Sequence, residues 1–137
     1  MKVFIDTSAF IAYFIKQEAF HEDCVLRMKL FLQQKVVLLT SDYVLDELLT
    51  WFSAKQNKHI LKQLITGLEK MQERDELRIL LIDPTIFKKA LAVIVKFSDH
   101  KISFTDATTY VLYKDFKLDE IFTLDKDFKR MRAKTSF

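Results

Sequence analysis

The sequence predicts an α/β fold in which a central parallel β-sheet is flanked by helices on both faces. Short runs of β-branched and aromatic residues alternate with longer segments whose apolar residues recur every three to four positions. Three of the short runs are continuously apolar, which is typical of strands buried on both faces of a parallel sheet. The 137 residues include one glycine and one proline, so loops should be few and helices should dominate. With half of its residues hydrophobic, the chain is expected to form a single domain over residues 1–137.

The amino-terminal part of the chain is predicted to contain a strand, two helices and a second strand. KVFI (2–5) is a short run of β-formers, and residues 8–15 have a helical pattern. From Phe20 onward an apolar residue recurs every three to four positions, which predicts an amphipathic helix over residues 20–34. KVVLLT (35–40) predicts a second buried strand.

The middle of the chain is predicted to be two helices followed by a third strand. The helices are expected over residues 42–55 and 57–74, because apolar residues fall on one face of each. RILLI (78–82) is again a continuous apolar run after its first residue, and predicts the third strand.

An aspartate and a proline mark the start of the next helix. Asp83 is a preferred N-cap residue and Pro84 suits the first helical position, so a helix is expected from there to about Phe97. SFTDATTYVLYKD predicts a further helix that starts near Ser103. EIFTL (120–124) predicts the fourth strand.

Two of the predicted strands are closed by aspartates. Asp6 directly follows KVFI, and Asp125 directly follows EIFTL, with Asp127 two residues further on. A carboxylate left buried without a partner would cost several kcal/mol. Open parallel sheets bind ligands at the carboxyl ends of their strands, so these acids are expected at that edge rather than inside the sheet. Taken singly, an aspartate at a strand end is also a common turn residue or N-cap.

Two further carboxylates lie in predicted helices. On a helical wheel Glu47 falls on the border of the apolar arc of its helix, whereas its neighbour Asp46 points to solvent. Asp106 lies in the first turn of a helix that is otherwise uncharged from Ser103 to Lys114, and which should therefore be largely buried. Each has a purely structural alternative, since Glu47 could reach water at the rim and Ser103-x-x-Asp106 matches a capping box.

Four carboxylates at one edge of a sheet would repel one another. At an effective dielectric of about 20, each pair near 4 Å costs roughly 4 kcal/mol, so protons or a cation must bind there. Oxygen ligands without histidine or cysteine suit a hard ion, Mg²⁺ or Mn²⁺. The three histidines, His21, His59 and His100, have no partner at metal-ligand spacing. The sequence therefore predicts a metal site made of aspartates and glutamate.

The overall charge and the single cysteine add weaker constraints. The net charge is +3, and residues 126–134 (KDFKRMRAK) hold five basic residues and one acid, as expected of either a phosphate-facing patch or a solvated tail. Cys24 excludes an internal disulfide and fits a buried helix face. The apolar run AFIAYFI is far shorter than a membrane span, and no secretory signal is visible. We expect a cytoplasmic protein with no membrane association.

Four short motifs, FIDTS, DELL, SFTDA and FTLDKDF, resemble those of the PIN-domain ribonucleases, in particular the VapC-like toxins of toxin–antitoxin pairs. The resemblance extends over essentially the whole chain and implies a PIN-like parallel sheet flanked by helices. It also implies Mg²⁺-dependent hydrolysis of RNA phosphodiester bonds, with Mn²⁺ as a possible substitute, and an antitoxin protein as a possible partner. The scarcity of glycine departs from what such domains normally show, which affects the loops rather than the site.

The resemblance also implies roles for individual residues. Asp6 and Asp106 would be the principal metal ligands, with Asp125 as a further metal ligand. Glu47 and Asp125 would complete the catalytic cluster through direct or water-mediated contacts, one of them orienting or deprotonating the attacking water. Supporting roles, orienting the acids or the substrate phosphate, would fall to Ser8 and Thr123, with Asp127 as a more variable acid. Flanking phosphates would be held by Lys55, Lys58 and the basic residues of 126–134.

Other interpretations remain open at this point. A PIN-fold module that binds RNA or assembles with partners without catalysis would share the fold, but the presence of all four acids argues against it. A phosphatase of the haloacid dehalogenase type would need a second aspartate where this chain has Ser8. The helices over 8–34 and 57–74 carry apolar surface that predicts a homodimer or an antitoxin groove, unless it simply packs on the domain.

Overall fold

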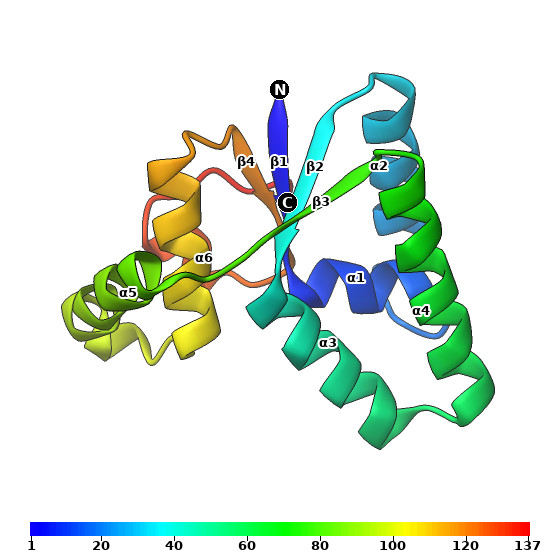
Figure 1. Ribbon diagram of the computed structural model, residues 1–137, viewed down its shortest axis with the longest axis horizontal. Helices are drawn as coiled ribbons and strands as arrows, with labels where there is room; N and C mark the ends of the chain where they lie inside the picture. The colour runs from blue at the N-terminus through cyan, green and yellow to red at the C-terminus, as the bar shows by residue number, and fades with distance from the viewer.

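The computed structural model describes residues 1–137 and contains four strands, seven α-helices and one short 3₁₀ helix. Figure 1 shows their arrangement. In chain order they are β1 (Lys2–Ile5), α1 (Thr7–Phe14), α2 (His21–Gln33), β2 (Val37–Ser41), α3 (Asp42–Lys55), α4 (Lys58–Glu73), β3 (Leu77–Leu80), α5 (Pro84–Lys96), η1 (Ser98–His100), α6 (Phe104–Asp115), β4 (Glu120–Phe122) and α7 (Asp127–Arg130). The sequence analysis did not anticipate η1 or α7, because three or four residues are too few to establish a helical period.

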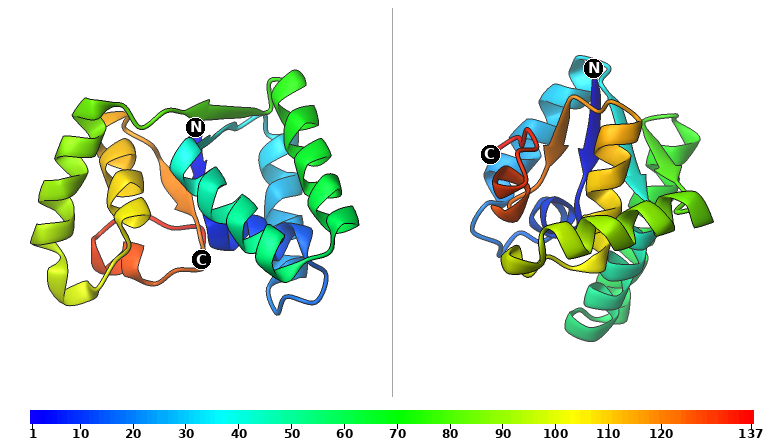
Figure 2. Two further views of the ribbon diagram at one scale, coloured as in Figure 1. Left: turned by 60° about the horizontal axis from the view of Figure 1, so that its bottom comes forward. Right: turned by 90° about the vertical axis from the view of Figure 1, so that its left-hand side faces the viewer.

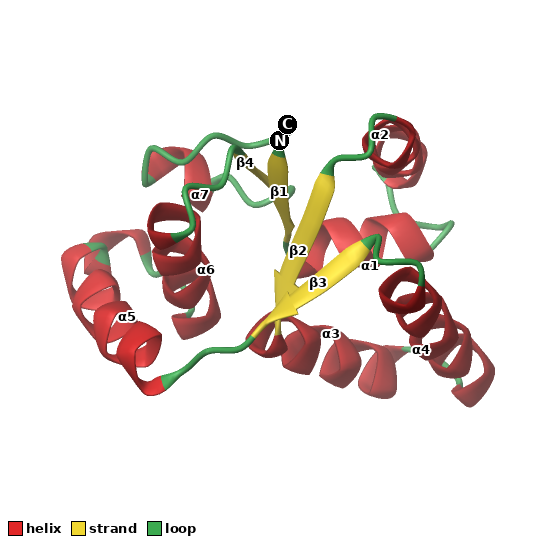
Figure 3. Ribbon diagram, turned by 45° about the horizontal axis from the view of Figure 1, so that its top comes forward, coloured by secondary structure: helices red, strands yellow, loops and turns green.

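The four strands form one parallel sheet in the order β3-β2-β1-β4, which confirms the predicted fold class. Parallel strands need crossover connections, and these are almost always right-handed. From β1 to β3 the chain steps across the sheet in one direction, whereas the step from β3 to β4 reverses it. The reversal puts α5 and α6 on the opposite face from α1, α2 and α4 (Figure 1). The right-hand view of Figure 2 shows α5 and α6 in front of the strands, and Figure 3 shows the sheet between the two groups of helices.

The central strand β1 lies in the middle of the hydrophobic core. Val3, Phe4 and Ile5 have no solvent-exposed surface, so both faces of the strand are covered by helices. Complete burial of one such side chain stabilises the fold by about 1.5–3 kcal/mol. The edge between β1 and β4 is the point where the direction of strand order reverses, and sheets of this type bind ligands at such a switch point.

Side chains accept hydrogen bonds from the backbone at the start of four helices. The predicted pair Asp83 and Pro84 begins α5, and the Asp83 carboxylate accepts a hydrogen bond of 2.8 Å from the backbone N of Ile86. Such a cap stabilises a helix by about 1 kcal/mol. The same function at α3, α4 and α6 belongs to Ser41, Asn57 and Ser103.

The chain makes its turns without glycine by placing other residues in the left-handed backbone conformation. Five residues at the carboxyl ends of helices have φ between 50° and 64°: Lys35, Asp75, Lys101, Lys117 and Arg132. Glycine is the usual residue at this position, and another residue there costs roughly 1–2 kcal/mol. The loops that the sequence analysis questioned thus use the left-handed turn that glycine usually makes, at some cost in stability.

Candidate active site

Asp6 lies at the junction between β1 and α1, where its carboxylate is buried but not unpaired. Its backbone N donates a 3.0 Å hydrogen bond to the carbonyl of Phe122, which extends the ladder between β1 and β4 by one residue. The side chain is 4% exposed, and its Oδ2 accepts a 2.8 Å hydrogen bond from the Thr123 hydroxyl. The Ser8 hydroxyl lies 3.3 Å from the same oxygen. The carboxylate is therefore held at the sheet edge by its neighbours.

Two hydroxyl groups join the start of α1 to the end of β4. Ser8 Oγ and Thr123 Oγ1 lie 3.1 Å apart, although the residues are 115 positions apart in the sequence. Ser8 Oγ accepts a hydrogen bond from the backbone N of Leu124, and Thr123 Oγ1 accepts one from the backbone N of Asp125, both at 3.0 Å. These contacts bring the segment that carries Asp125 next to Asp6. The residues involved lie just beyond β4, which ends at Phe122, two residues before the predicted end.

Glu47 lies on α3 and is half-buried, while its neighbour Asp46 is exposed. The hydroxyl of Thr7, the first residue of α1, donates a 2.9 Å hydrogen bond to Glu47 Oε1. The contact fixes the orientation of the glutamate toward the β1–α1 junction. The sequence analysis missed Thr7, and the only signal for it was a hydroxyl directly after Asp6 in FIDTS.

Asp106 lies in the first turn of α6, where it takes part in the capping box anticipated as a structural alternative. Its backbone N donates to Ser103 Oγ at 3.0 Å, and its Oδ2 accepts from the backbone N of Ser103 at 3.1 Å. Burial nevertheless raises the pKa of Asp106 to about 7, and the charges of Asp6 and Asp125 contribute to the increase. The hydrogen bonds from Ser103 lower the pKa but do not offset these effects. Asp106 is thus both a capping residue and a neighbour of the other acids.

The four carboxylates interact electrostatically. Burial raises the pKa of Asp6 to about 6, against the opposing effect of hydrogen bonds from Thr123 and the Thr7 backbone. The negative charges of Glu47 and Asp125 raise the pKa of Asp6 further. Since Asp6 and Asp125 in turn raise the pKa of Asp106, all four groups belong to one cluster. Perturbed carboxylates of this kind concentrate at functional sites.

Asp125 and Asp127 differ in their surroundings. Asp125 Oδ1 accepts a 2.9 Å hydrogen bond from the backbone N of Asp127, which turns the chain into α7. Asp127 is engaged by Arg130 in a 2.9 Å ion pair on α7, so its charge is already balanced. Asp127 therefore lies beside the four interacting acids but not among the groups whose charges raise the pKa of Asp6 or Asp106.

Comparison with known proteins identifies the family. The family model for the PIN domain matches residues 3–134. The chain belongs to the PIN domain family. Its structure is similar to the crystal structure of Mycobacterium tuberculosis VapC20, a sarcin-ricin loop cleaving toxin, with a TM-score of 0.80 and 20% sequence identity over 96% of this chain and 95% of that chain. VapBC2 from Rickettsia felis, bound to a DNA fragment from its promoter, matches with a TM-score of 0.75 and 14% identity over 99% and 98%. No curated protein sequence matches.

These comparisons confirm the resemblance drawn from FIDTS, DELL, SFTDA and FTLDKDF. In this PIN domain FIDTS lies at the β1–α1 junction and DELL on α3. SFTDA lies at the start of α6, and FTLDKDF runs from the end of β4 into α7. All four motifs meet because the carboxyl ends of β1 and β4 are neighbours and because α3 and α6 both begin at that edge of the sheet (Figure 1). None of the helices is long and apolar enough to cross a membrane.

The donor atoms at this edge of the PIN domain fit a hard divalent cation. They are carboxylate and hydroxyl oxygens, while the ring of His21 is engaged elsewhere by the carbonyl of Ala12 at 2.8 Å. No three acidic, histidine or cysteine side chains lie close enough together to enclose an ion by themselves. Mg²⁺ is commonly bound by one or two carboxylates together with water and substrate phosphates. These oxygen atoms are therefore suited to an ion that a bound substrate also coordinates.

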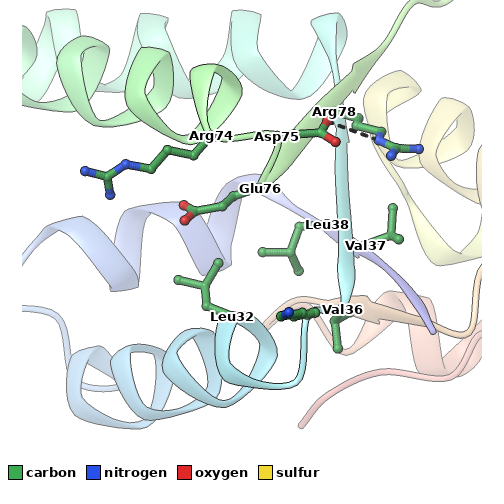
Figure 4. Close-up of a pocket in the computed structure, with 9 residues that line it drawn as sticks. Leu32, Val36, Val37, Leu38, Arg74, Asp75, Glu76 and Arg78 are labelled. Atoms are coloured by element: carbon green, nitrogen blue, oxygen red, sulfur yellow. Dashed lines mark ion pairs between the residues drawn. The ribbon is translucent and has the colours of Figure 1, made fainter.

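A hollow next to the acids offers space for a ligand, and a second one lies far from them. The first, of about 420 Å³, is lined by Thr7, Asp46, Glu47, Thr50 and Trp51. The cavity in Figure 4, of about 480 Å³, lies instead between the ends of α2 and α4 and the amino ends of β2 and β3. Because the acids lie at the carboxyl ends of the strands, the cavity in Figure 4 is not part of their site.

The basic carboxyl-terminal stretch is packed onto the PIN domain and is not a solvated tail. Phe128, Met131 and Ala133 are buried, and Thr135 forms a β-bridge with Ile121. The basic side chains between them are exposed: Lys126, Lys129, Arg130, Arg132 and Lys134. The predicted phosphate contacts Lys55 and Lys58 are also exposed, but Lys55 ends α3, more than two turns beyond Glu47, and Lys58 begins α4.

Proposed function

We propose that this PIN domain is a metal-dependent endoribonuclease that hydrolyses RNA phosphodiester bonds, and that it is the toxin of a type II toxin–antitoxin module. The observation that supports this most strongly is the cluster of Asp6, Glu47, Asp106 and Asp125, whose mutual repulsion a divalent cation would relieve. The similarity in fold to a sarcin-ricin loop cleaving toxin supports RNA as the substrate class.

The proposed roles follow from the contacts of each side chain. Asp6, Asp106 and Asp125 would hold Mg²⁺ or Mn²⁺ together with water and substrate oxygens, and the ion would supply polarisation of a phosphoryl oxygen and a more acidic water. Thr123 and Ser8 keep the Asp6 carboxylate in one orientation through their hydroxyls. Glu47, which Thr7 holds toward the same edge, orients the attacking water or accepts its proton.

A cleavage assay on defined RNAs tests this function directly. With Mg²⁺ or Mn²⁺ we expect endonucleolytic products, and with EDTA none, because carboxylates alone cannot polarise the phosphoryl group. Binding of RNA without cleavage, equal with and without metal, would instead support the non-catalytic PIN module.

We further propose two protein partners, an antitoxin and a second copy of the chain. The similarity to VapBC2 supports an antitoxin, and both partners and the RNA would be encountered in the cytoplasm, where we place the protein. The sequence analysis expected apolar surface on residues 8–34 and 57–74, and Leu26 and Ile65 are indeed exposed there. A more continuous stripe lies on α5, where Phe87, Leu91 and Val95 recur every four residues and are 41%, 47% and 74% exposed.

Light scattering of the purified protein should give twice the 16.3 kDa mass of the chain. Val95→Glu should shift this mass to that of a monomer, because a charge within a desolvated apolar interface is strongly unfavourable. Leu26→Glu on α2, which is 59% exposed, is the matched control and should leave the mass unchanged. A monomeric wild-type protein would exclude the homodimer.

A further inference from the structure

A further hollow, different from the two described above, lies beside the acidic edge, on the face of the sheet covered by α5 and α6. It measures about 450 Å³ and is bounded by the end of α5, by η1, by one face of α6 and by the end of α7. The left-hand view of Figure 2 shows η1 and α7 close to each other at this end of the molecule. We call it the α5–α7 pocket. None of its lining residues belongs to the acidic cluster.

The α5–α7 pocket is strongly cationic. Four of its lining residues are Lys or Arg, and Asp99 is its one carboxylate. Of these cations only Arg130 is in an ion pair. Lys96 Nζ lies 5.3 Å from the ring centre of Phe97, and Lys114 Nζ lies 5.6 Å from that of Tyr110. Both ammonium groups thus lie over aromatic faces, where they remain free to bind an anion.

Aromatic rings form the floor of the same pocket. The rings of Phe97 and Tyr110 are in contact edge to face, with centres 5.4 Å apart, and the ring of His100 lies 5.6 Å from that of Phe97. Nδ1 of His100 is buried and has no hydrogen-bond partner. Half-buried aromatic rings next to unpaired cations are the combination that binds single-stranded nucleic acid, because bases stack on the rings while phosphates contact the cations.

The pocket adjoins the acidic cluster along two elements. On α6, Tyr110 follows Asp106 by four residues, so the two share a face and are about 6 Å apart along the helix axis. On α7, Arg130 is paired with Asp127, whose backbone N binds the carboxylate of Asp125. A chain bound across the acids would therefore reach the pocket within a short distance.

We infer that the α5–α7 pocket binds the single-stranded RNA that flanks the scissile phosphate, with phosphates on Lys96, Lys114 and Arg132 and a base against Phe97 and Tyr110. The inference rests on the proposed function for the choice of RNA as ligand. It explains how a cluster of negative charges receives a polyanion, since the binding energy comes from cations next to the cluster.

Another basic hollow on the molecule provides a matched control. It is lined by residues of α4 alone, including Lys62 and Lys70, and its one ring is the imidazole of His59; no Phe, Tyr or Trp side chain lines it. It therefore offers cations without a Phe, Tyr or Trp ring for stacking. Figure 1 shows α4 on the opposite side of the sheet from α5 and α6.

The test is the binding of a fluorescent single-stranded RNA in EDTA, where no cleavage occurs. Lys96→Glu combined with Lys114→Glu should weaken binding about tenfold or more and reduce the slope of log K against log salt by about 1.4, the value for two phosphate contacts on a single strand. Lys62→Glu combined with Lys70→Glu makes the same change in net charge and should leave the slope unaltered. Tyr110→Leu should weaken binding about fivefold or more without a change in slope. Thermal melts verify that each variant is folded.

Equal loss of affinity in the two double variants, or none in either, would overturn the inference. The result is independent of catalysis, because binding is measured without metal. Cleavage by wild type together with unchanged RNA binding by the pocket variants would refute the pocket and leave the proposed function standing. RNA binding that depends on the pocket, by a wild-type protein that cuts no RNA, would support the pocket and refute the proposed function.

Discussion

Asp6→Asn should reduce the rate of RNA cleavage by on the order of 10³-fold, which corresponds to the several kcal/mol of charge stabilisation that a bound metal supplies. Asp6 is the most buried of the four acids, and it is the one that both Ser8 and Thr123 approach. Asparagine has nearly the same shape and its amide oxygen can still accept the hydrogen bond from Thr123, so the fold should persist. The initial rate of cleavage of a defined RNA with saturating Mg²⁺ measures the effect.

Asp75→Asn is the control for this change. Asp75 is exposed, lies at the opposite edge of the sheet next to the cavity in Figure 4, and has a left-handed backbone that asparagine tolerates well. Its variant should cleave RNA within about twofold of wild type, because exposed ion pairs such as that with Arg78 contribute little. Unchanged cleavage by Asp6→Asn would remove Asp6 from the proposed metal site.

The metal-free protein should lose stability as the pH rises from about 4 to about 7. Burial raises the pKa of Asp6 from 3.8 to about 6 and that of Asp106 to about 7, so between these values the folded state holds protons that the unfolded state has released. Because the folded state binds more protons, the free energy of unfolding falls with rising pH over this range. For Asp6 alone the loss is roughly 3 kcal/mol. Urea unfolding in EDTA across this range measures it.

Mg²⁺ should reverse this loss. A cation that binds the ionised acids should raise the melting temperature strongly at pH 8 and hardly at pH 5, where protons compete for the same oxygens. Asp6→Asn should flatten the pH dependence and reduce the effect of Mg²⁺, whereas Asp75→Asn should alter neither. Equal stabilisation by Mg²⁺ at both pH values would show that the ion binds elsewhere.

Local patterns in the sequence were sufficient for the four strands and the six longer helices, and for the parallel arrangement of the sheet. Continuous apolar runs became β1, β2 and β3, and the pair Asp83 and Pro84 became the start of α5, because period, capping and proline geometry depend only on neighbouring residues. The strand ends were less accurate. β2 begins two residues later than predicted, since Lys35 adopts a left-handed turn after α2.

The sequence by itself also determined which residues are candidates for the site, because an acid next to an apolar run or an apolar helix face can be recognised from neighbouring residues alone. Their surroundings were decided only by the tertiary structure. The contact of Ser8 with Thr123, the hydrogen bond from Thr7 to Glu47 and the pKa values of Asp6 and Asp106 all depend on groups far apart in the chain. The same is true of the α5–α7 pocket, whose cations and rings come from four separate elements. Burial and electrostatic interaction depend on distance in space, and that distance exists only once the sheet has brought the carboxyl ends of β1 and β4 together.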